Sequence, residues 1–347
     1  ERLRRAVQNG ERMFDLPSPR IGGQWAKTSP KTRSGYFLTA VTKATLNQTI
    51  EFAAASGDAM PYITILQASW STGQGMYNVS SAWGGISGLR DAVKQANEQG
   101  VKIGLHTLSA GIAHDSPYIS PVPDRRLAKR GGLTLAKDVG VADSWLPLWE
   151  KPSSLPAPYC CPLFPVAMLI DHEIVTYNAT NVSAPYGLSK VNRGAYGTRA
   201  APHRRNATVW QLLTGNGFLP DPESSLLDEI AANLARTYNE IGAEMLYLDG
   251  LEAVGPTGAF AMSKFQRAVW RHIKGDLLAE SSCCDSGPWH MNARSGQTDW
   301  AATDTRVFMD TTKAQSCQTV TEDLTVPDMG WWGYNNFVPT VFDATTP

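Results

Sequence analysis

Segments with strand character alternate with segments of helical character along most of the chain, and this alternation limits the fold more than any other feature. Apolar, β-branched runs are typical of buried strands, and apolar residues at helical spacing predict the helices between them. Strands joined by helices pair in parallel. The expected strands are 35–41, 62–67, 101–106, 244–250, 276–280, 305–310 and 329–334, and the main expected helices are 45–56, 88–100, 225–242 and 259–274.

A parallel sheet of this kind belongs either to a Rossmann-type fold or to a closed barrel. A Rossmann sheet carries a glycine-rich turn after its first strand, and the turn after residues 35–41 has none. The 347 residues suit one barrel of ~250 residues with about a hundred residues of insertions. The sequence therefore predicts an α/β fold, a (β/α)8 TIM-type barrel with an inserted β-rich subdomain.

The alternation is interrupted once. Residues 115–222 are rich in proline, glycine and turn signals, with short strand-like pieces at 166–169 and 173–177. We expect this segment to be a β-rich insertion on the His106 side of the barrel, with no barrel strands. The barrel itself then comes from residues 1–114 and 223–347.

Charge and spacing argue against several classes of protein. Lys+Arg 31 against Asp+Glu 32 gives a net charge of −1, without the basic excess of a nucleic-acid-binding protein. No run of ~18 apolar residues is present, so no membrane span is expected. The histidines, cysteines and carboxylates lack the spacing of metal ligands, so we expect no metal and no other cofactor.

Sequons and cysteines favour a secreted, extracellular glycoprotein with loop-joining disulfides. An odd cysteine count leaves one thiol without an intramolecular partner. The chain begins at Glu1 rather than at methionine, which indicates a processed form or a piece of a larger polypeptide or assembly. The expected glycosylation sites are Asn47, Asn78, Asn178, Asn181 and Asn206, and the disulfide candidates are Cys160, Cys161, Cys283, Cys284 and Cys317.

Polar and aromatic residues gather at the ends of the expected strands, where barrels place their functional groups. Asp249 ends one strand, and Gly250 lets the chain turn away sharply. Glu280 ends the next strand. Carboxylates with aromatic residues are typical of sugar sites, because indole faces stack on pyranose rings. The substrate-binding candidates are Trp70, His106, Glu252, Trp289, Arg294, Asp299 and Trp331.

Two parts of the chain resemble retaining α-galactosidase-type glycoside hydrolases. Residues 62–70 and 84–106 are similar to the early βα units of that family, and Tyr247-Leu248-Asp249-Gly250 resembles its strand that ends in the nucleophilic aspartate. The resemblance implies a (β/α)8 barrel that hydrolyses O-glycosyl bonds, with Asp249 as nucleophile. The chain departs from the pattern at Tyr247, where the family has lysine. The family's acid/base is an aspartate, for which this chain offers Glu280, Asp285 or Asp299.

The leading hypothesis is a secreted glycoside hydrolase acting on a poly- or oligosaccharide, with Asp249 as nucleophile and Glu280 as acid/base. His106 and Arg294 would bind hydroxyls or an acidic substituent. Two alternatives stay open. A polysaccharide lyase would use His106 or Tyr247 as base with Arg294 near the substrate carboxylate. A non-catalytic, glycan-binding or structural component of a matrix, wall or filament would keep the barrel without turnover.

Overall fold

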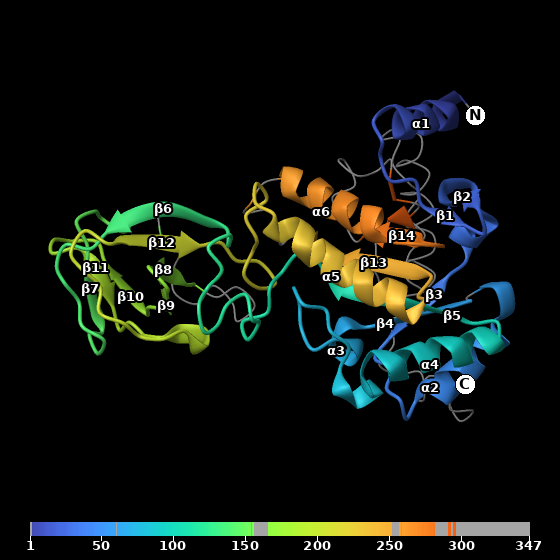
Figure 1. Cartoon of the computed structure of the whole chain (residues 1–347), viewed down its shortest axis with the longest axis horizontal. Coiled ribbons are helices and arrows are strands. Elements are labelled where there is room, and N and C mark those ends of the chain that lie inside the picture. Colours follow the sequence, from blue (N-terminus) through green and yellow to red (C-terminus); the bar gives the residue numbers. More distant parts are fainter. Residues whose placement is uncertain are drawn as a thin grey trace, which may run out of the picture.

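The computed structural model describes residues 2–59, 61–153, 155, 166–251, 257, 259–281, 291–292 and 294–295. Figure 1 shows two parts. One part contains both helices and strands, and the other is a β-rich part whose sequence is inserted into that of the first. The expected strands 305–310 and 329–334 lie outside the described residues. No helix among the described residues is long and apolar enough to cross a membrane.

One parallel sheet forms the centre of the mixed part. Its strands stand side by side in the order in which they follow one another along the chain. Each neighbouring pair is parallel. In sheet order the strands are β3 (Tyr36–Thr39), β4 (Tyr62–Ile65), β5 (Lys102–Leu108), β13 (Met245–Asp249), β14 (Leu278–Ser281) and β15 (Arg294–Ser295).

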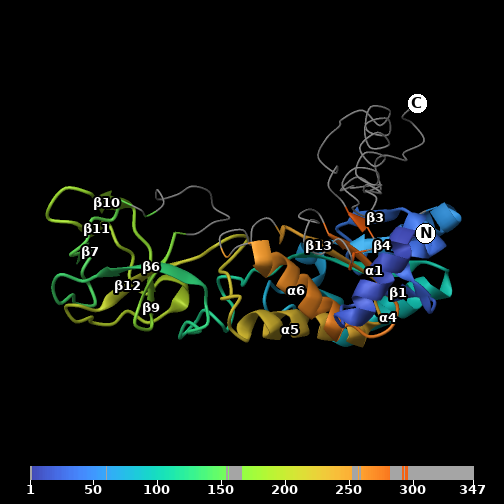
Figure 2. The same cartoon turned by 90° about the horizontal axis from the view of Figure 1, so that it is seen from above.

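The long helices cover one face of this sheet. Ile63, Ile103 and Leu246 on that face belong to the large apolar core that also contains buried helix residues. The opposite face carries a separate cluster that includes Tyr36 and Tyr247. Figure 2 shows α4, α5 and α6 on the same side of the strands. The helices are α2 (Leu46–Ala55), α4 (Gly85–Glu98), α5 (Leu226–Ile241) and α6 (Ala259–His272), with the short α3 (Gln67–Trp70) after β4.

Sequential strand order with helices on one face is the arrangement of a (β/α) barrel, whose other face points into the barrel. A doubly wound sheet would carry helices on both faces. The chain therefore has the (β/α)8 TIM-type fold with an inserted β-rich subdomain, and six barrel strands lie among the described residues.

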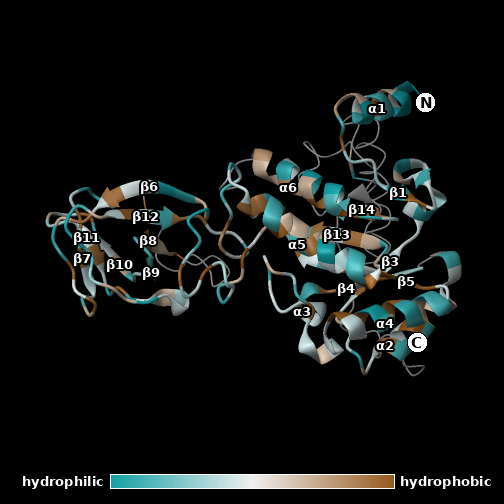
Figure 3. Ribbon diagram, in the orientation of Figure 1, coloured by the Kyte–Doolittle hydropathy of each residue, from teal (hydrophilic) through white to brown (hydrophobic). Residues whose placement is uncertain are grey.

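Helix α5 illustrates how the sequence sets these elements. Its apolar residues recur on one side and are buried, among them Leu226, Leu234 and Tyr238. Gly242, at a φ of 76°, ends the helix in a left-handed conformation that suits glycine. Figure 3 shows hydrophilic residues along α4 on the side away from the strands. The amphipathic pattern thus fixes which side of each helix faces the sheet.

The N-terminal segment covers the end of the sheet where the strands begin. The backbone N–H of Leu277 donates to the Arg20 carbonyl (2.8 Å), and the Gly22 N–H donates to Asp276 (2.7 Å). Ile21 lies in the inner cluster with Tyr36. The segment consists of α1 (Arg2–Met13), the hairpin β1 (Arg20–Ile21) and β2 (Gln24–Trp25), and the 3-10 turns η1 (Ala26–Thr28) and η2 (Pro30–Arg33); η3 (Gly57–Ala59) and η4 (Ser81–Trp83) come later.

The described residues of the insertion form two antiparallel sheets, and none of these strands pairs with the parallel sheet. Its entry and exit segments pair with each other through the bridges Ile112–Phe218 and Leu127–Pro220. One sheet has the order β6 (Lys129–Thr134), β12 (Thr208–Leu212), β8 (Met168–Ile170) and β9 (Glu173–Val175). The other has the order β10 (Ala179–Asn181), β11 (Gly187–Ser189) and β7 (Trp145–Pro147), and η5 is Ala195–Gly197.

A buried ionic network holds the insertion together. The Glu173 side chain is 0% exposed and accepts two hydrogen bonds of 2.8 Å from the guanidinium of Arg193. It also accepts from His203 Nε2 (2.8 Å) and from the backbone N–H groups of Gly194 (2.8 Å) and Ala201 (3.0 Å). A buried carboxylate is tolerated when it is this fully paired.

Candidate active site

The strands that end near His106, Asp249 and Glu280 are neighbours, as the sequence predicts. Tyr247 of β13 pairs with His106 of β5 on one side and with Glu280 of β14 on the other. Paired residues of parallel strands point to the same face, so this row faces the barrel interior. Asp249 follows Tyr247 by two residues, so its side chain points to the same face and lies at the end of the strand.

His106 and Asp249 form the central contact of the site. The distance from His106 Nε2 to Asp249 Oδ2 is 3.0 Å. The other ring nitrogen, Nδ1, accepts the backbone N–H of Gln67 at 3.3 Å. Because Nδ1 accepts, the tautomer assigned from these contacts is neutral, with its proton on Nε2 directed at the carboxylate. His106 therefore holds and orients Asp249.

Two residues of α3 fix the position of the His106 strand. The Gln67 Oε1 atom accepts from Thr107 Oγ1 (2.8 Å) and from the Leu108 backbone N–H (2.7 Å). The Trp70 Nε1 atom donates to the His106 carbonyl (2.8 Å), and Trp70 is 0% exposed. A side chain this buried cannot stack on a sugar. The expectation that Trp70 binds substrate is wrong, and the residue supports the strand that carries His106.

Asp249 reaches the open end of the sheet, with 20% of its side chain exposed. Its Oδ1 atom accepts the N–H of Gly250 (2.8 Å), so both oxygens receive a donor, which suits an ionised carboxylate. Gly250 has a φ of 69°. Asn216, from the segment that returns from the insertion, donates to its carbonyl (3.4 Å). The base of the insertion therefore lies at the same end of the sheet as Asp249.

Glu280 lies deeper than Asp249. It is 0% exposed, and its Oε1 atom accepts from Tyr36 OH at 2.5 Å. The Tyr247 ring lies between those of Tyr36 and His106, with centroid distances of 6.3 and 5.4 Å. A general acid must contact the glycosidic oxygen, so the burial of Glu280 argues against the acid/base role expected of it. The sequence offered no signal for its partner Tyr36, which lies 244 positions earlier.

Strand geometry gives a separation for the two carboxylates. Asp249 lies two residues beyond Tyr247, the residue that pairs with Glu280. With a strand spacing of about 4.8 Å and a rise of about 3.3 Å per residue, the Cα atoms of Asp249 and Glu280 are roughly 8 Å apart. Retaining glycosidases hold their carboxyl groups about 5–5.5 Å apart. A Cα separation of roughly 8 Å is compatible with that carboxyl distance, so the burial of Glu280 is the observation that stands against its acid/base role.

Several predicted site residues fall outside the described residues: Glu252, Trp289, Asp299 and Trp331, and the cysteines Cys160, Cys161, Cys283, Cys284 and Cys317. Arg294 is the first residue of β15 and stands beside Glu280 in the register of the two strands. Four of the five sequon asparagines are exposed and Asn181 is half-buried. Within the described part of the chain, no three histidines, cysteines or carboxylates gather as metal ligands would.

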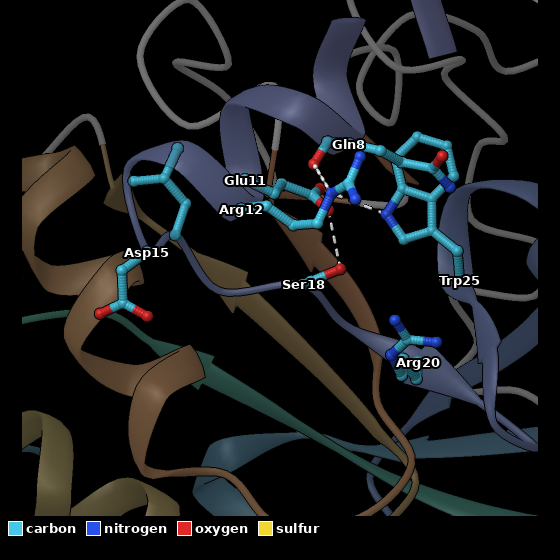
Figure 4. A pocket seen from close by; sticks show the side chains of 8 residues that line it. Gln8, Glu11, Arg12, Asp15, Ser18, Arg20 and Trp25 are labelled. Carbon is cyan, nitrogen blue, oxygen red and sulfur yellow. Dashed lines mark hydrogen bonds between the residues drawn. The ribbon is translucent and has the colours of Figure 1, made fainter. Parts of the chain in front are cut away.

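A different pocket, of about 430 Å³, lies beside α1 and is shown in Figure 4. Its buried Glu11 accepts from Ser18 Oγ (2.7 Å) and Trp25 Nε1 (3.2 Å). Burial raises the pKa of Glu11, although these hydrogen bonds and nearby cations oppose it. The adjoining hairpin of β1 and β2 packs at the end of the parallel sheet where its strands begin. Asp249 lies at the other end. Active sites of such barrels lie at the carboxyl ends of the strands, whereas the other end contributes to stability, and this pocket lies at that other end.

No protein-family model matches the chain, and no curated protein matches it. Solved structures do match. A trehalulose synthase mutant in complex with Tris has 10% identity and a TM-score of 0.50, over 85% of this chain and 56% of that chain. This likeness concerns the fold and agrees with the barrel topology.

Two further solved structures have lower TM-scores. A β-L-arabinopyranosidase from Geobacillus stearothermophilus, in complex with arabinose, has 12% identity and a TM-score of 0.48, over 88% of this chain and 62% of that one. An α-galactosidase from Thermus thermophilus, in complex with p-nitrophenyl α-D-galactopyranoside, has 13% identity and a TM-score of 0.43, over 81% and 42%. The chain spans less than two thirds of each of these proteins.

Proposed function

We propose that this chain is the barrel part of a glycoside hydrolase in which Asp249 is the nucleophile. The observation that carries the proposal is the placement of Asp249. It is a partly exposed carboxylate at the end of the fourth barrel strand from the N-terminus, and His106 Nε2 orients it at 3.0 Å. The family resemblance assigns the same aspartate the same role.

The acid/base is assigned to Asp299 in place of Glu280. Asp299 lies four positions beyond Ser295 in the sequence, outside the described residues, and the family resemblance assigns the acid/base role to an aspartate. An Asp249 oxygen attacks the anomeric carbon while Asp299 protonates the departing glycosidic oxygen. Asp299 then takes a proton from the water that cleaves the glycosyl–Asp249 ester, which restores both carboxyl groups.

The contacts of His106 and Tyr247 favour hydrolysis over the lyase alternative. A lyase base must reach a substrate proton. Both ring nitrogens of His106 are engaged, by Asp249 and by the Gln67 N–H, and Tyr247 is 0% exposed. The substrate class proposed is an oligo- or polysaccharide, with α-galactosides first because of the family resemblance.

The test is turnover on a panel of nitrophenyl glycosides and natural oligosaccharides, α-galactosides included. Asp249→Asn should lower kcat by roughly 10³–10⁶-fold, the scale of a lost nucleophile. Azide should rescue Asp299→Ala, because a small anion replaces the missing base at the second step. Asp58→Ala, which removes an exposed carboxylate before the start of β4, is the matched control and is expected to retain activity.

Three outcomes would contradict the proposal. Rescue of Glu280→Ala instead of Asp299→Ala would return the acid/base role to Glu280. A product that absorbs in the near ultraviolet would identify a lyase. A wild-type chain that is inert on the whole panel would favour the non-catalytic alternative.

The proposed location is extracellular. Its support is the five sequons, four of them on exposed asparagines. Peptide N-glycosidase treatment of the protein from its native source should lower its mass at two or more of these sites. Unmodified asparagines and fully reduced cysteines would contradict this location.

A further inference from the structure

A second aromatic-lined pocket lies in the β-rich subdomain. Its volume is about 860 Å³, and its walls come from residues 136–139, 142–145, 147–149 and 184–186. Figures 1 and 2 both place the sheet of β7, β10 and β11 at the end of the molecule farthest from the parallel sheet. Small-ligand sites have volumes of roughly 300–1,000 Å³, so this pocket is large enough for a ligand of its own.

Strand register turns one tryptophan out of the subdomain core. Leu146 of β7 pairs with Leu188 of β11, and both are fully buried in that core. Trp145 precedes Leu146 in the strand and therefore lies on the opposite face. The Trp145 ring packs against Gly187, where an added Cβ would come within 2.5 Å of its ring atoms. Glycine at 187 thus allows the half-buried ring to lie close against the strand.

Trp149 is held in place while remaining open to solvent. It is 51% exposed. The Arg205 guanidinium lies 5.1 Å from the centre of its ring, and its Nε1 donates to Asn206 Oδ1 (3.3 Å). An ordered ring at the surface can bind a ligand without a large loss of side-chain entropy. The subdomain core is complete without this ring, so its exposure is not explained by folding.

The polar groups of the pocket favour a neutral ligand. Asp138 accepts from the Arg205 N–H (2.7 Å) and from Arg204 Nη1 (3.1 Å). Asp143 accepts from the Gly140 N–H (2.7 Å). These carboxylates are engaged within the protein, and Lys137 adds a positive charge beside them. The lining therefore has no strong excess of either sign.

A ligand that suits this lining presents apolar ring faces to the aromatic side chains and hydroxyl groups to the polar ones. A pyranose ring has both features. We propose that this pocket binds a neutral oligosaccharide, as a glycan-binding site separate from the Asp249 site. The proposal goes beyond the hydrolase activity and does not need Asp249 to be a nucleophile.

The test is affinity electrophoresis of the full chain, made without N-glycans in a bacterial host. Separate gels contain galactomannan, mixed-linkage β-glucan, soluble starch or, as a charged comparison, dextran sulfate. The wild-type chain should be retarded in at least one neutral gel. Trp145→Ala and Trp149→Ala should each weaken the apparent affinity about tenfold. Phe260→Ala, which removes a 65% exposed ring on α6 outside the pocket, is the matched control and should behave as wild type.

Tyr186→Ala provides a third pocket variant whose ring lies in the loop between strands, in case Trp145→Ala unfolds the small sheet. Asp249→Asn should keep full retardation even where turnover is lost. Retardation that disappears in Asp249→Asn would place the glycan at the barrel and overturn the proposal. Absence of retardation in every neutral gel would also overturn it, as would binding to dextran sulfate alone. Trp149-dependent retardation without any hydrolysis would leave this inference intact and contradict only the hydrolase proposal.

Discussion

Neutralising Glu173 should destabilise the β-rich subdomain more than any other single charge removal among its described residues. Glu173→Gln keeps the shape of the side chain and removes the charge that faces Arg193 and His203. The buried Arg193 guanidinium then lacks its carboxylate, and His203 keeps only Asp171, whose Oδ2 lies 2.7 Å from its Nδ1. Removing one partner of a buried ion pair costs roughly 3–5 kcal/mol.

The pKa of Glu173 gives an independent magnitude. Burial alone would raise the pKa, but hydrogen bonds from His203, Arg193 and two backbone N–H groups outweigh it and lower the pKa from 4.5 to about 2. That difference corresponds to ~3 kcal/mol of unfolding free energy. A depressed carboxyl pKa contributes stability above the unfolded value of about 4.5, and this contribution is lost as the pH falls toward 2.

The assay is hydrogen exchange with mass spectrometry on the full chain, read over residues 168–212 at pH 7, with denaturant unfolding in parallel. Glu173→Gln should lower protection there by about 10²-fold or more, as expected for a loss of roughly 3 kcal/mol. The control is Glu150→Gln, because Glu150 is exposed and accepts from the Thr134 N–H and Oγ1. Its effect should stay below about 1 kcal/mol.

Two results would refute this reasoning. Wild-type protection in Glu173→Gln would mean that the network does not stabilise the subdomain. A difference between the two proteins that persists unchanged from pH 7 to pH 2 would mean that the Glu173 charge is not its source.

Three further predictions concern the barrel part. Glu11→Gln should be at least as stable as wild type at pH 7, because burial raises the Glu11 pKa; its thermal advantage should disappear as the pH falls below about 4.5. Tyr36→Phe removes the donor to buried Glu280 and should cost about 1–3 kcal/mol in urea unfolding, whereas no change would contradict that contact. Trp70→Phe loses the bond to the His106 carbonyl and should lower both stability and kcat; a rise in KM alone would indicate sugar stacking instead.

The sequence predicts the parallel sheet well because its strands are continuous apolar runs and its helices are strongly amphipathic. The helix expected at 225–242 is observed as Leu226–Ile241, ended by Gly242 as expected. The hairpin Arg20–Trp25 has strands of only two residues, which leave no periodic signal. Its position is set by contacts with Asp276 and Leu277, more than 250 positions away.

The sequence predicts which strand ends form the candidate site, but it does not predict how deeply each side chain is buried. Strand order brings His106 and Asp249 together, since both lie near the ends of neighbouring strands. Whether a residue near a strand end reaches the open end of the barrel or stays in its interior depends on the strand register. The register places Glu280 beside Tyr247, two residues deeper in the barrel than Asp249. Trp70 shows the same limit, because a tryptophan at a strand end suits both a sugar platform and a packed support.

The Glu173 network escaped prediction for a different reason. Alternation along a strand separates neighbouring residues onto opposite faces, which argued against a cluster around residues 171–173. The partners that complete the network, Arg193 and His203, come instead from later loops. Contacts of this kind follow from tertiary packing and have no local pattern.

The most direct test of Asp249 as the nucleophile is to trap the glycosyl-enzyme intermediate. The chain is incubated with a 5-fluoro glycosyl fluoride of the sugar that the panel identifies, digested, and analysed by mass spectrometry. We expect one covalent adduct, on the peptide that contains Asp249, and none in Asp249→Asn. An adduct on another carboxylate, or full turnover by Asp249→Asn, would contradict it.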